Sequence, residues 1–180
     1  RGETVAIVGE SGSGKSVTMK AVMGIISNNQ HIDHGSIHYS WWDENGQKQT
    51  VDIAKMGSRD VRSKICGRHI SMVFQDPMTG TAATMGIEEN LALAKRRGKT
   101  RLLKPGITKK EREEYKELLK VLGLGLEDRL TSKVGLLSGG QRQALTLLMA
   151  TMNPPKLLLL DEHTAALDPG TAEKVVICIL

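Results

Sequence analysis

A stretch near the start of the chain, GESGSGKS at residues 9–16, has the residue types of a phosphate site. Small residues at this spacing let successive backbone N–H groups turn toward phosphate oxygens where the next helix begins. Lys15 is placed to reach β- and γ-phosphates, and the hydroxyl of Ser16 can ligate Mg²⁺. The pattern therefore predicts a nucleotide-binding loop.

Two apolar runs further along the chain end in polar residues. The run at 70–74 leads into Gln75, and the LLLL run at 157–160 leads into Asp161 and Glu162. We expect the second run to be a strand buried on both sides, which would deliver its carboxylates at a carboxyl end of a sheet. These polar strand ends are candidate site residues, and the carboxylates emerge where chemistry at a phosphate loop would need them.

A third candidate is the start of a predicted helix, where Ser138, Gly139 and Gly140 precede a run rich in alanine and leucine. The dipole and bare backbone of a helix N-terminus can face an anion.

The elements that must position these residues follow from local patterns. ETVAIVG at 3–9 predicts a strand before the phosphate loop, and residues 16–23 predict a short helix that Gly24 ends. Residues 35–53 place Ile37, Tyr39 and Trp41 on one face and turn at 45–46, which predicts an antiparallel hairpin.

The middle of the chain has helical periodicity. Residues 85–97 place Ile87, Leu91 and Ala94 on one face. A second helix opens with a capping box from Thr108 to Glu111 and closes at Gly123. Its predicted core stripe is Tyr115, Leu118, Leu119 and Leu122.

Composition limits the class of protein. The 180 residues are 39% hydrophobic and 3% aromatic, which suits one soluble globular domain. The sequence contains no apolar run near the ~20 residues that span a bilayer and no signal-peptide pattern. Cys66 and Cys178 lie far apart and suggest neither a metal site nor a disulfide framework, so we expect a reducing cytosol.

The net charge of +5 lies largely in KRRGKTRLLKPGITKK at 95–110. No aromatic residue interleaves this segment, which favours a solvated loop and helix end and leaves open a face for an acidic partner or lipid headgroups. We expect no nucleic acid. His31, His34 and His38 are close in sequence, but no acidic or thiol partner completes ligand spacing, and we interpret them as structural.

With these motifs in this order, the chain resembles the nucleotide-binding domain of an ATP-binding cassette (ABC) transporter over essentially its whole length. The phosphate loop, the Q-loop residue Gln75, the signature LSGGQ at 137–141, the Walker B strand ending in Asp161 and the D-loop ALD at 166–168 all follow the family's sequence. Residues 2–77 resemble ATPases of dipeptide and oligopeptide importers. The later half is similar to another group of bacterial importer ATPases, for small solutes such as amino acids.

The resemblance implies an α/β fold. It is a P-loop NTPase with an ABC-type ATPase core, a mostly parallel sheet, an antiparallel β-hairpin region and a helical subdomain. We expect a partial nucleotide-binding domain at 1–180, with its core at about 1–80 and 138–180 and its helical subdomain at about 81–137.

The resemblance also implies ATP and Mg²⁺ as cofactors and gives each motif residue a role. Glu162 would be the general base, and Gln75 would sense the γ-phosphate and metal. Ser16, Gln75 and Asp161 would form the metal site. The residues expected to contact nucleotide are Gly9, Ser11, Gly12, Ser13, Gly14, Lys15, Ser16, Val17, Ser138, Gly139, Gly140, Gln141 and Asp168.

The partners are implied in the same way. Two such domains, as a homodimer or heterodimer, would pair head to tail on ATP, so that Ser138 and Gly140 of one cover ATP on Lys15 of the other. The other expected partners are transmembrane permease subunits and, indirectly, a solute-binding protein. This implies a peripheral location at the cytoplasmic face of the cell membrane and ATP hydrolysis that energises import of peptides or amino-acid-like solutes.

Two parts of the family's pattern are not found in the sequence, an aromatic residue upstream that stacks on adenine and a switch histidine downstream. We therefore expect binding of ATP–Mg²⁺ with hydrolysis far slower than in a longer version.

Two alternatives stay open. A soluble ABC ATPase of DNA repair or translation is disfavoured by the lack of zinc-type cysteine pairs, a long heptad insertion or a tandem cassette. A non-hydrolysing nucleotide-binding module would be recognised by a phosphate-release assay.

Overall fold

The computed structural model describes residues 3–27, 29–76, 78–97, 106–161 and 170. The chain divides into two compact units, residues 1–66 and 67–180, and each is described by itself. The predicted division into an ATPase core and a helical subdomain stays a prediction.

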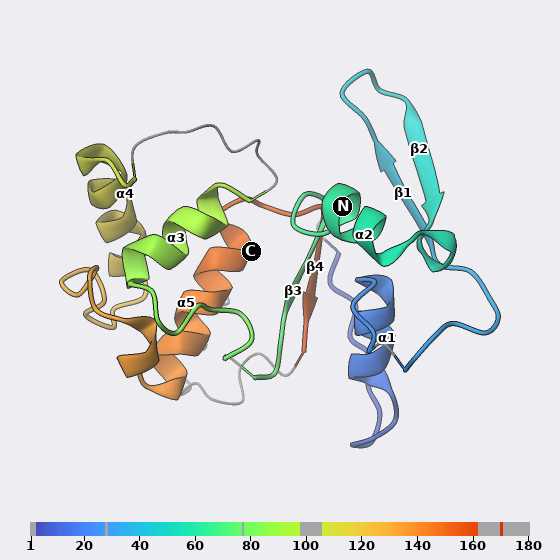
Figure 1. Ribbon diagram of the computed structural model, residues 1–180, viewed down its shortest axis with the longest axis horizontal. Helices are drawn as coiled ribbons and strands as arrows, with labels where there is room; N and C mark the ends of the chain where they lie inside the picture. The colour runs from blue at the N-terminus through green and yellow to red at the C-terminus, as the bar shows by residue number, and fades with distance from the viewer. Residues whose placement is uncertain (1–2, 28, 77, 98–105, 162–169, 171–180) are drawn as a thin grey trace. The chain divides into compact units, whose positions relative to one another are not determined.

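The N-terminal unit joins the phosphate loop to a β-hairpin (Figure 1). Its regular elements are α1 (Lys15–Val22), β1 (His38–Trp42), β2 (Lys48–Asp52), a 3-10 turn η1 (Ile53–Lys55), a short α2 (Ser58–Asp60) and a π-helical turn η2 (Val61–Ile65). Strands β1 and β2 are antiparallel, with His38 opposite Asp52 and Trp42 opposite Lys48. The hairpin prediction is therefore confirmed.

Residues at the hairpin follow the expected chemistry. Gly46 has φ +73, the left-handed backbone that a tight turn requires there. The rings of Tyr39 and Trp41 stack with centroids 5.5 Å apart on one face of β1. The core of this unit is small and consists of Met23, Ile53, Val61 and Ile65.

The predicted strand before the phosphate loop is wrong for this structure. Residues 3–10 form no strand, and the side chains of Val5 and Val8 are 75% and 92% exposed. Branched side chains favour an extended backbone, but a strand also needs a neighbour for its ladder hydrogen bonds. The described residues of this unit supply no such neighbour, so the sequence preference alone does not make a strand.

The C-terminal unit combines two parallel strands with a group of helices. Its elements are β3 (Ile70–Val73), α3 (Ile87–Lys95), α4 (Lys109–Lys120), a 3-10 turn η3 (Val134–Leu136), α5 (Gly139–Thr151) and β4 (Leu157–Leu160). Strands β3 and β4 lie side by side in Figure 1, with Ile70 opposite Leu157 and Val73 opposite Leu160. Helix α5 packs against β3 and α3, and its apolar side chains form the centre of the core.

The middle helices bear out most of the predicted pattern. Ile87, Leu91 and Ala94 are buried on α3, and the predicted capping box is present at the start of α4. Leu118 is a correction, because it is 36% exposed whereas Leu119 is fully buried. At i+3 from Tyr115 it lies at the edge of the apolar stripe, where the core no longer covers it.

Strand β4 is also less buried than predicted. Leu157 is 41% exposed, and the other three leucines are only partly buried. Within the described residues β4 pairs with one strand, β3, so neighbours cover it less completely than they cover a central strand.

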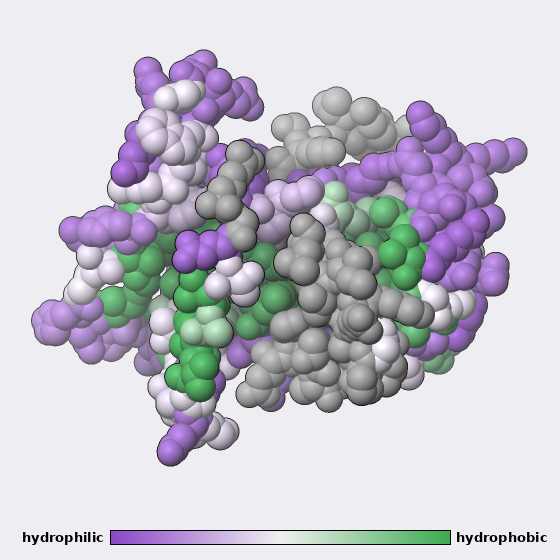
Figure 2. All heavy atoms as spheres, turned by 180° about the vertical axis from the view of Figure 1, so that it is seen from behind, coloured by the Kyte–Doolittle hydropathy of each residue, from purple (hydrophilic) through white to green (hydrophobic). Residues whose placement is uncertain are grey.

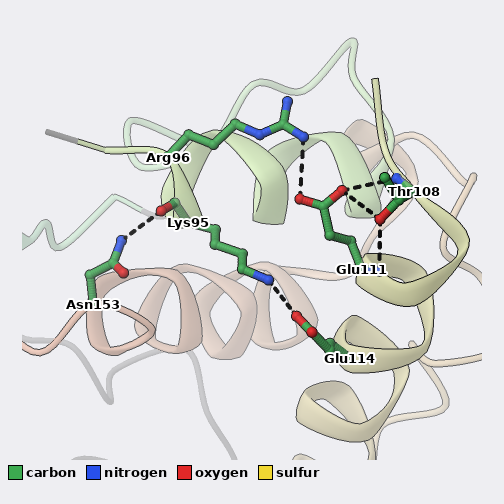
Figure 3. A network of polar contacts seen from close by, with 6 residues as sticks. All are labelled: Lys95, Arg96, Thr108, Glu111, Glu114 and Asn153. Carbon is green, nitrogen blue, oxygen red and sulfur yellow. Dashed lines mark hydrogen bonds and ion pairs between the residues drawn. The ribbon is translucent and has the colours of Figure 1, made fainter. Parts of the chain in front are cut away.

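A polar network ties the ends of the three long helices together (Figure 3). Lys95 of α3 pairs with Glu114 of α4, and Arg96 pairs with Glu111 at 3.3 Å. Asn153, after α5, donates to the carbonyl oxygens of Ala94 and Lys95 at 2.8 and 3.1 Å and so caps α3. The hydrogen bond to Glu114 raises the pKa of Lys95 above its usual value.

The outer side of α4 is strongly hydrophilic. Figure 2 shows these side chains as the purple region on its right, and most lysines and glutamates of the helix are exposed. Searched over the described ranges, the chain has no helix whose length and hydropathy would let it cross a membrane.

Candidate nucleotide-binding site

The phosphate loop has the backbone that its sequence predicts. Gly12 and Gly14 have φ of +83 and +90, a left-handed conformation that favours glycine. The N–H of Ser13 donates to Glu10 O at 3.2 Å, which closes the turn, and α1 begins directly afterwards at Lys15. The predicted order of loop and helix is confirmed, with α1 ending before Gly24 as expected.

The side chain of Lys15 lies back along this loop. Its ammonium donates to Gly9 O at 2.6 Å, to Glu10 O at 2.7 Å and to Ser13 Oγ at 3.3 Å. A Cβ on Gly9 would come within 2.8 Å of Ser13 Oγ, so a side chain there would force the Ser13 hydroxyl to shift. The positive charge is thus held by the loop itself, at the surface of the unit.

The loop can accept a phosphate chemically. The backbone N–H and the side-chain hydroxyl of Thr18 both donate to Gly14 O, at 2.9 and 3.0 Å. The helical hydrogen-bond pattern therefore starts with the N–H of Thr18, and the earlier N–H groups of α1 lie outside that pattern. A Cβ on Gly12 or Gly14 would meet no atom within 4 Å, so the loop presents its backbone to open space. With the ammonium of Lys15 and the hydroxyl of Ser16 beside these amides, the donor set fits an Mg²⁺-bound phosphate.

The other predicted loop residues surround this backbone. Ser11 is exposed in the turn, and Val17 is 50% exposed in the first turn of α1. Ser16 is half-buried.

In the C-terminal unit the structure brings Gln75 and Asp161 to one edge of the sheet. Asp161 directly follows β4, is buried, and donates its N–H to Val73 O at 3.0 Å. Gln75 follows β3 by two positions and is exposed. The register of two parallel strands therefore places both residues after the carboxyl ends of β3 and β4, at one edge of the sheet.

The turn after Gln75 is fixed by its neighbour Asp76. The Asp76 carboxylate accepts from Met78 N at 2.8 Å, and Asp76 O accepts from the Thr79 hydroxyl at 2.7 Å. Glu162 and Asp168, predicted as general base and as a nucleotide contact, lie outside the described residues.

The signature residues form the first turn of α5. Ser138 is the N-cap, and its Oγ accepts from Gln141 N at 3.2 Å while Gln141 Oε1 accepts from Ser138 N at 3.1 Å. Gln141 also donates to Leu124 O at 3.4 Å. Gly139 is exposed, so the start of α5 is open to a ligand or a partner.

Sequence reasoning missed two buried polar residues that support this region, Asn90 on α3 and Arg142 on α5. The side chains of both residues hydrogen-bond to backbone atoms of loops. A polar residue on the apolar face of a predicted helix is a signal that could have pointed to Asn90, since it falls between Ile87 and Ala94.

Within the described ranges, no group of three or more His, Cys, Asp or Glu residues could hold a metal ion. His31 makes an ion-pair contact with Asp33 at 2.9 Å.

Comparison with solved structures defines the class of fold. The chain superimposes on the dimeric structure of MJ0796, a bacterial ABC transporter cassette, with a TM-score of 0.71 and 23% identity, covering 94% of this chain and 65% of that one. Together with the phosphate loop, this likeness defines a P-loop NTPase fold of the ABC ATPase type.

The family follows from sequence. The model of the ABC transporter family matches residues 1–165, and the chain belongs to that family. It is 38% identical over 177 residues to the tyrosine transport ATP-binding protein of Clostridioides difficile, covering 97% of this chain and 62% of the relative. It is 36% identical over 171 residues to the dipeptide transport ATP-binding protein DppD of Haemophilus influenzae, covering 93% of this chain and 47% of the relative. The predicted family and its likeness to peptide-importer ATPases are confirmed.

Proposed function

We propose that this chain binds ATP and Mg²⁺ and hydrolyses ATP to energise a bacterial importer of peptides or amino-acid-like solutes. The observation that carries the proposal is the loop at residues 9–16, where a left-handed glycine backbone, the first turn of α1 and the Lys15 ammonium converge. The transport role is supported by relatives named as transport ATP-binding proteins, which match 93% or more of the chain.

In this proposal the chain works by positioning and charge stabilisation. Lys15 leaves its contacts with Gly9 O and Glu10 O to bind the β- and γ-phosphates, which compete for the same ammonium. The backbone at Gly9 and at residues 11–14, with Val17, surrounds the phosphates.

The metal and the attacking water are assigned to a second set of residues. Ser16, Gln75 and Asp161 would hold Mg²⁺, which would supply neutralisation of the charge on the phosphate oxygens. Gln75 senses the γ-phosphate, and Glu162 takes the proton of the attacking water as general base. The closeness of Gln75 and Asp161 at one sheet edge supports this assignment.

The signature is proposed to act on nucleotide held by a second domain. Ser138, Gly139, Gly140 and Gln141 form a helix start at which Ser138 and Gly139 are exposed and the other two are half-buried, which suits an anion approaching from outside the chain. Asp168 is proposed to contact the nucleotide as well. MJ0796, similar in fold, forms a dimer, which supports a paired arrangement here.

The remaining partners are proposed from the family. They are permease subunits in the membrane and, through them, a solute-binding protein, with the chain peripheral on the cytoplasmic face of the membrane.

The experiment measures binding of a fluorescent ATP analogue to the chain and to Lys15→Ala. We expect the variant to lose binding, because the β- and γ-phosphates lose their one lysine in the loop. Lys20→Ala is the matched control, since this lysine lies on the same helix and is exposed. Equal affinity of all three proteins would contradict the proposed site. A phosphate-release assay then separates a hydrolysing chain from a module that only binds nucleotide.

A further inference from the structure

Two segments of the C-terminal unit that are far apart in sequence are paired through their backbones. Val134 N donates to Met85 O at 3.0 Å, and Gly135 N donates to Ala83 O at 2.8 Å. Next to them, Gly86 forms an antiparallel bridge with Lys133. The segment that follows Gln75 therefore lies directly against the turn that precedes the signature.

The contact between these segments is close. A Cβ on Gly135 would lie 3.0 Å from Ala83 O, so a side chain there would push the segments apart. Earlier in the same segment, a Cβ on Gly80 would lie 2.5 Å from Thr146 Cγ2 on α5. The segment thus packs closely against η3 and α5.

Asn90 of α3 holds the first of the two segments. It is 1% exposed, and its Oδ1 accepts from Ala82 N at 2.8 Å. Its Nδ2 donates to Ala82 O at 3.1 Å and to Gly86 O at 2.9 Å. Nδ2 also donates to Met85 O at 3.5 Å. One amide thus contacts four backbone groups of the loop, and only a side chain with both a donor and an acceptor can do so.

Arg142 of α5 holds the second segment. It is 7% exposed, and its Nη2 donates to Val134 O and to Gly135 O, at 3.1 Å in both cases. Its backbone N–H donates to Ser138 O at 3.0 Å. Arg142 therefore links η3 to the first turn of the helix that carries the signature.

Burying an amide and a guanidinium costs free energy unless they are well hydrogen-bonded, and apolar side chains could fill such sites at lower cost. The directional hydrogen bonds of Asn90 and Arg142 instead fix the backbone of both paired segments, on the two sides of the junction where these segments meet.

We propose that Asn90 and Arg142 are positioning residues that couple the segment after Gln75 to the signature at Ser138. Through them, a displacement at one of these two sites is transmitted to the other. The proposal rests on the proposed function, in which Gln75 and Ser138 act on the bound nucleotide.

The test compares Asn90→Asp with Asn153→Asp. The two asparagines are compared because each donates through Nδ2 to backbone carbonyl oxygens, Asn90 to those of Ala82, Met85 and Gly86, and Asn153 to those of Ala94 and Lys95 at the far end of α3. Each aspartate would place an oxygen against carbonyl oxygens, and because Asn90 is 1% exposed whereas Asn153 is half-buried, we expect the larger loss of Tm in Asn90→Asp.

The expected difference lies in catalysis. Because misplacement by about 1 Å can cost roughly 10²-fold in rate, Asn90→Asp should lower kcat at least about tenfold while affinity for the ATP analogue stays within about twofold. Asn153→Asp should keep the kcat of the parent chain. Arg142→Ala should behave as Asn90→Asp does, Arg142→Lys should restore part of kcat, and the double variant should be no slower than the slower single variant, since both act on one junction.

Equal kcat losses in Asn90→Asp and Asn153→Asp, or additive losses in the double variant, would overturn the proposal. If Asn90→Asp does not fold, the test uses Arg142→Ala and Arg142→Lys in its place. If both of these variants have the kcat of the parent chain, the proposed coupling is overturned. A parent chain that binds no ATP analogue overturns the proposed function and this inference with it. If the parent chain binds and hydrolyses ATP and the variants keep its kcat, this inference is overturned but the proposed function is not.

Discussion

At the scale of single residues, the ion pair between Glu88 and Arg112 joins α3 to α4. Arg112 Nε and Nη2 donate to the two carboxylate oxygens of Glu88 at 2.6 and 2.8 Å. Glu88 is 7% exposed, and the hydrogen bonds from Arg112 lower the pKa of its carboxyl below its usual value despite burial. A two-pronged pair of this kind fixes orientation as well as distance.

This pair predicts a pH dependence of stability. A carboxyl whose pKa is lower in the folded than in the unfolded state stabilises the fold above its unfolded pKa, and that contribution is lost as pH falls through the folded value. We expect the free energy of unfolding to fall as pH drops below about 4.5, and Glu88→Gln to flatten that dependence. Urea unfolding at a series of pH values measures it.

The control for this prediction is Glu117→Gln. Glu117 pairs with Lys120 on the solvent side of α4, at 2.6 Å, where an ion pair contributes little. A pH dependence that changes equally in both variants would show that the buried pair has no special part in it.

At the scale of elements, α4 and α5 begin with the same device. Thr108 and Glu111 form the capping box of α4, and Ser138 and Gln141 form that of α5. In each box the hydroxyl accepts from the third N–H of the helix and the longer side chain returns to the cap. The second box is thus both a helix start and the proposed signature.

Replacing each cap by alanine separates these two roles. Thr108→Ala and Ser138→Ala should each lower the free energy of unfolding by about 1 kcal/mol, since an orphaned N–H replaces a satisfied one. Only Ser138→Ala should also lower ATP hydrolysis. Denaturant unfolding and phosphate release, measured on both variants, check this prediction. Equal ATPase rates in the two variants would show that Ser138 acts only as a helix cap.

What could be predicted from sequence is what is local along the chain. The hairpin turn at Gly46, the box at Thr108 and the apolar stripe of α3 each depend on residues within a few positions of one another. The strand expected at residues 3–9 was wrong because strand formation depends on a distant neighbour that the sequence does not specify.

The same limit applies to the candidate site. Motifs identify Lys15, Gln75 and Ser138, but no pattern shows that Lys15 rests on the carbonyls of its own loop. Nor does any pattern show that Asn90 and Arg142 hold segments about 50 positions apart, since those contacts arise only from tertiary packing.

At the scale of the whole molecule, the proposed site is divided between chains. The phosphate loop and the signature belong to different units of one chain, and in the proposed function each works with its counterpart from a second domain. ATP would then act as part of the interface, and association would depend on it.

The most direct test is the mass of a Glu162→Gln variant in light scattering, with and without ATP–Mg²⁺. Without nucleotide we expect the mass of one chain. With ATP we expect twice that mass, because the variant loses the proposed general base for the hydrolysis that would dissolve the pair, and also loses a carboxylate that the γ-phosphate would repel. Adding Lys15→Ala to the same variant should abolish the ATP-dependent dimer. A mass that ATP does not change, whether of one chain or of two, would contradict the account.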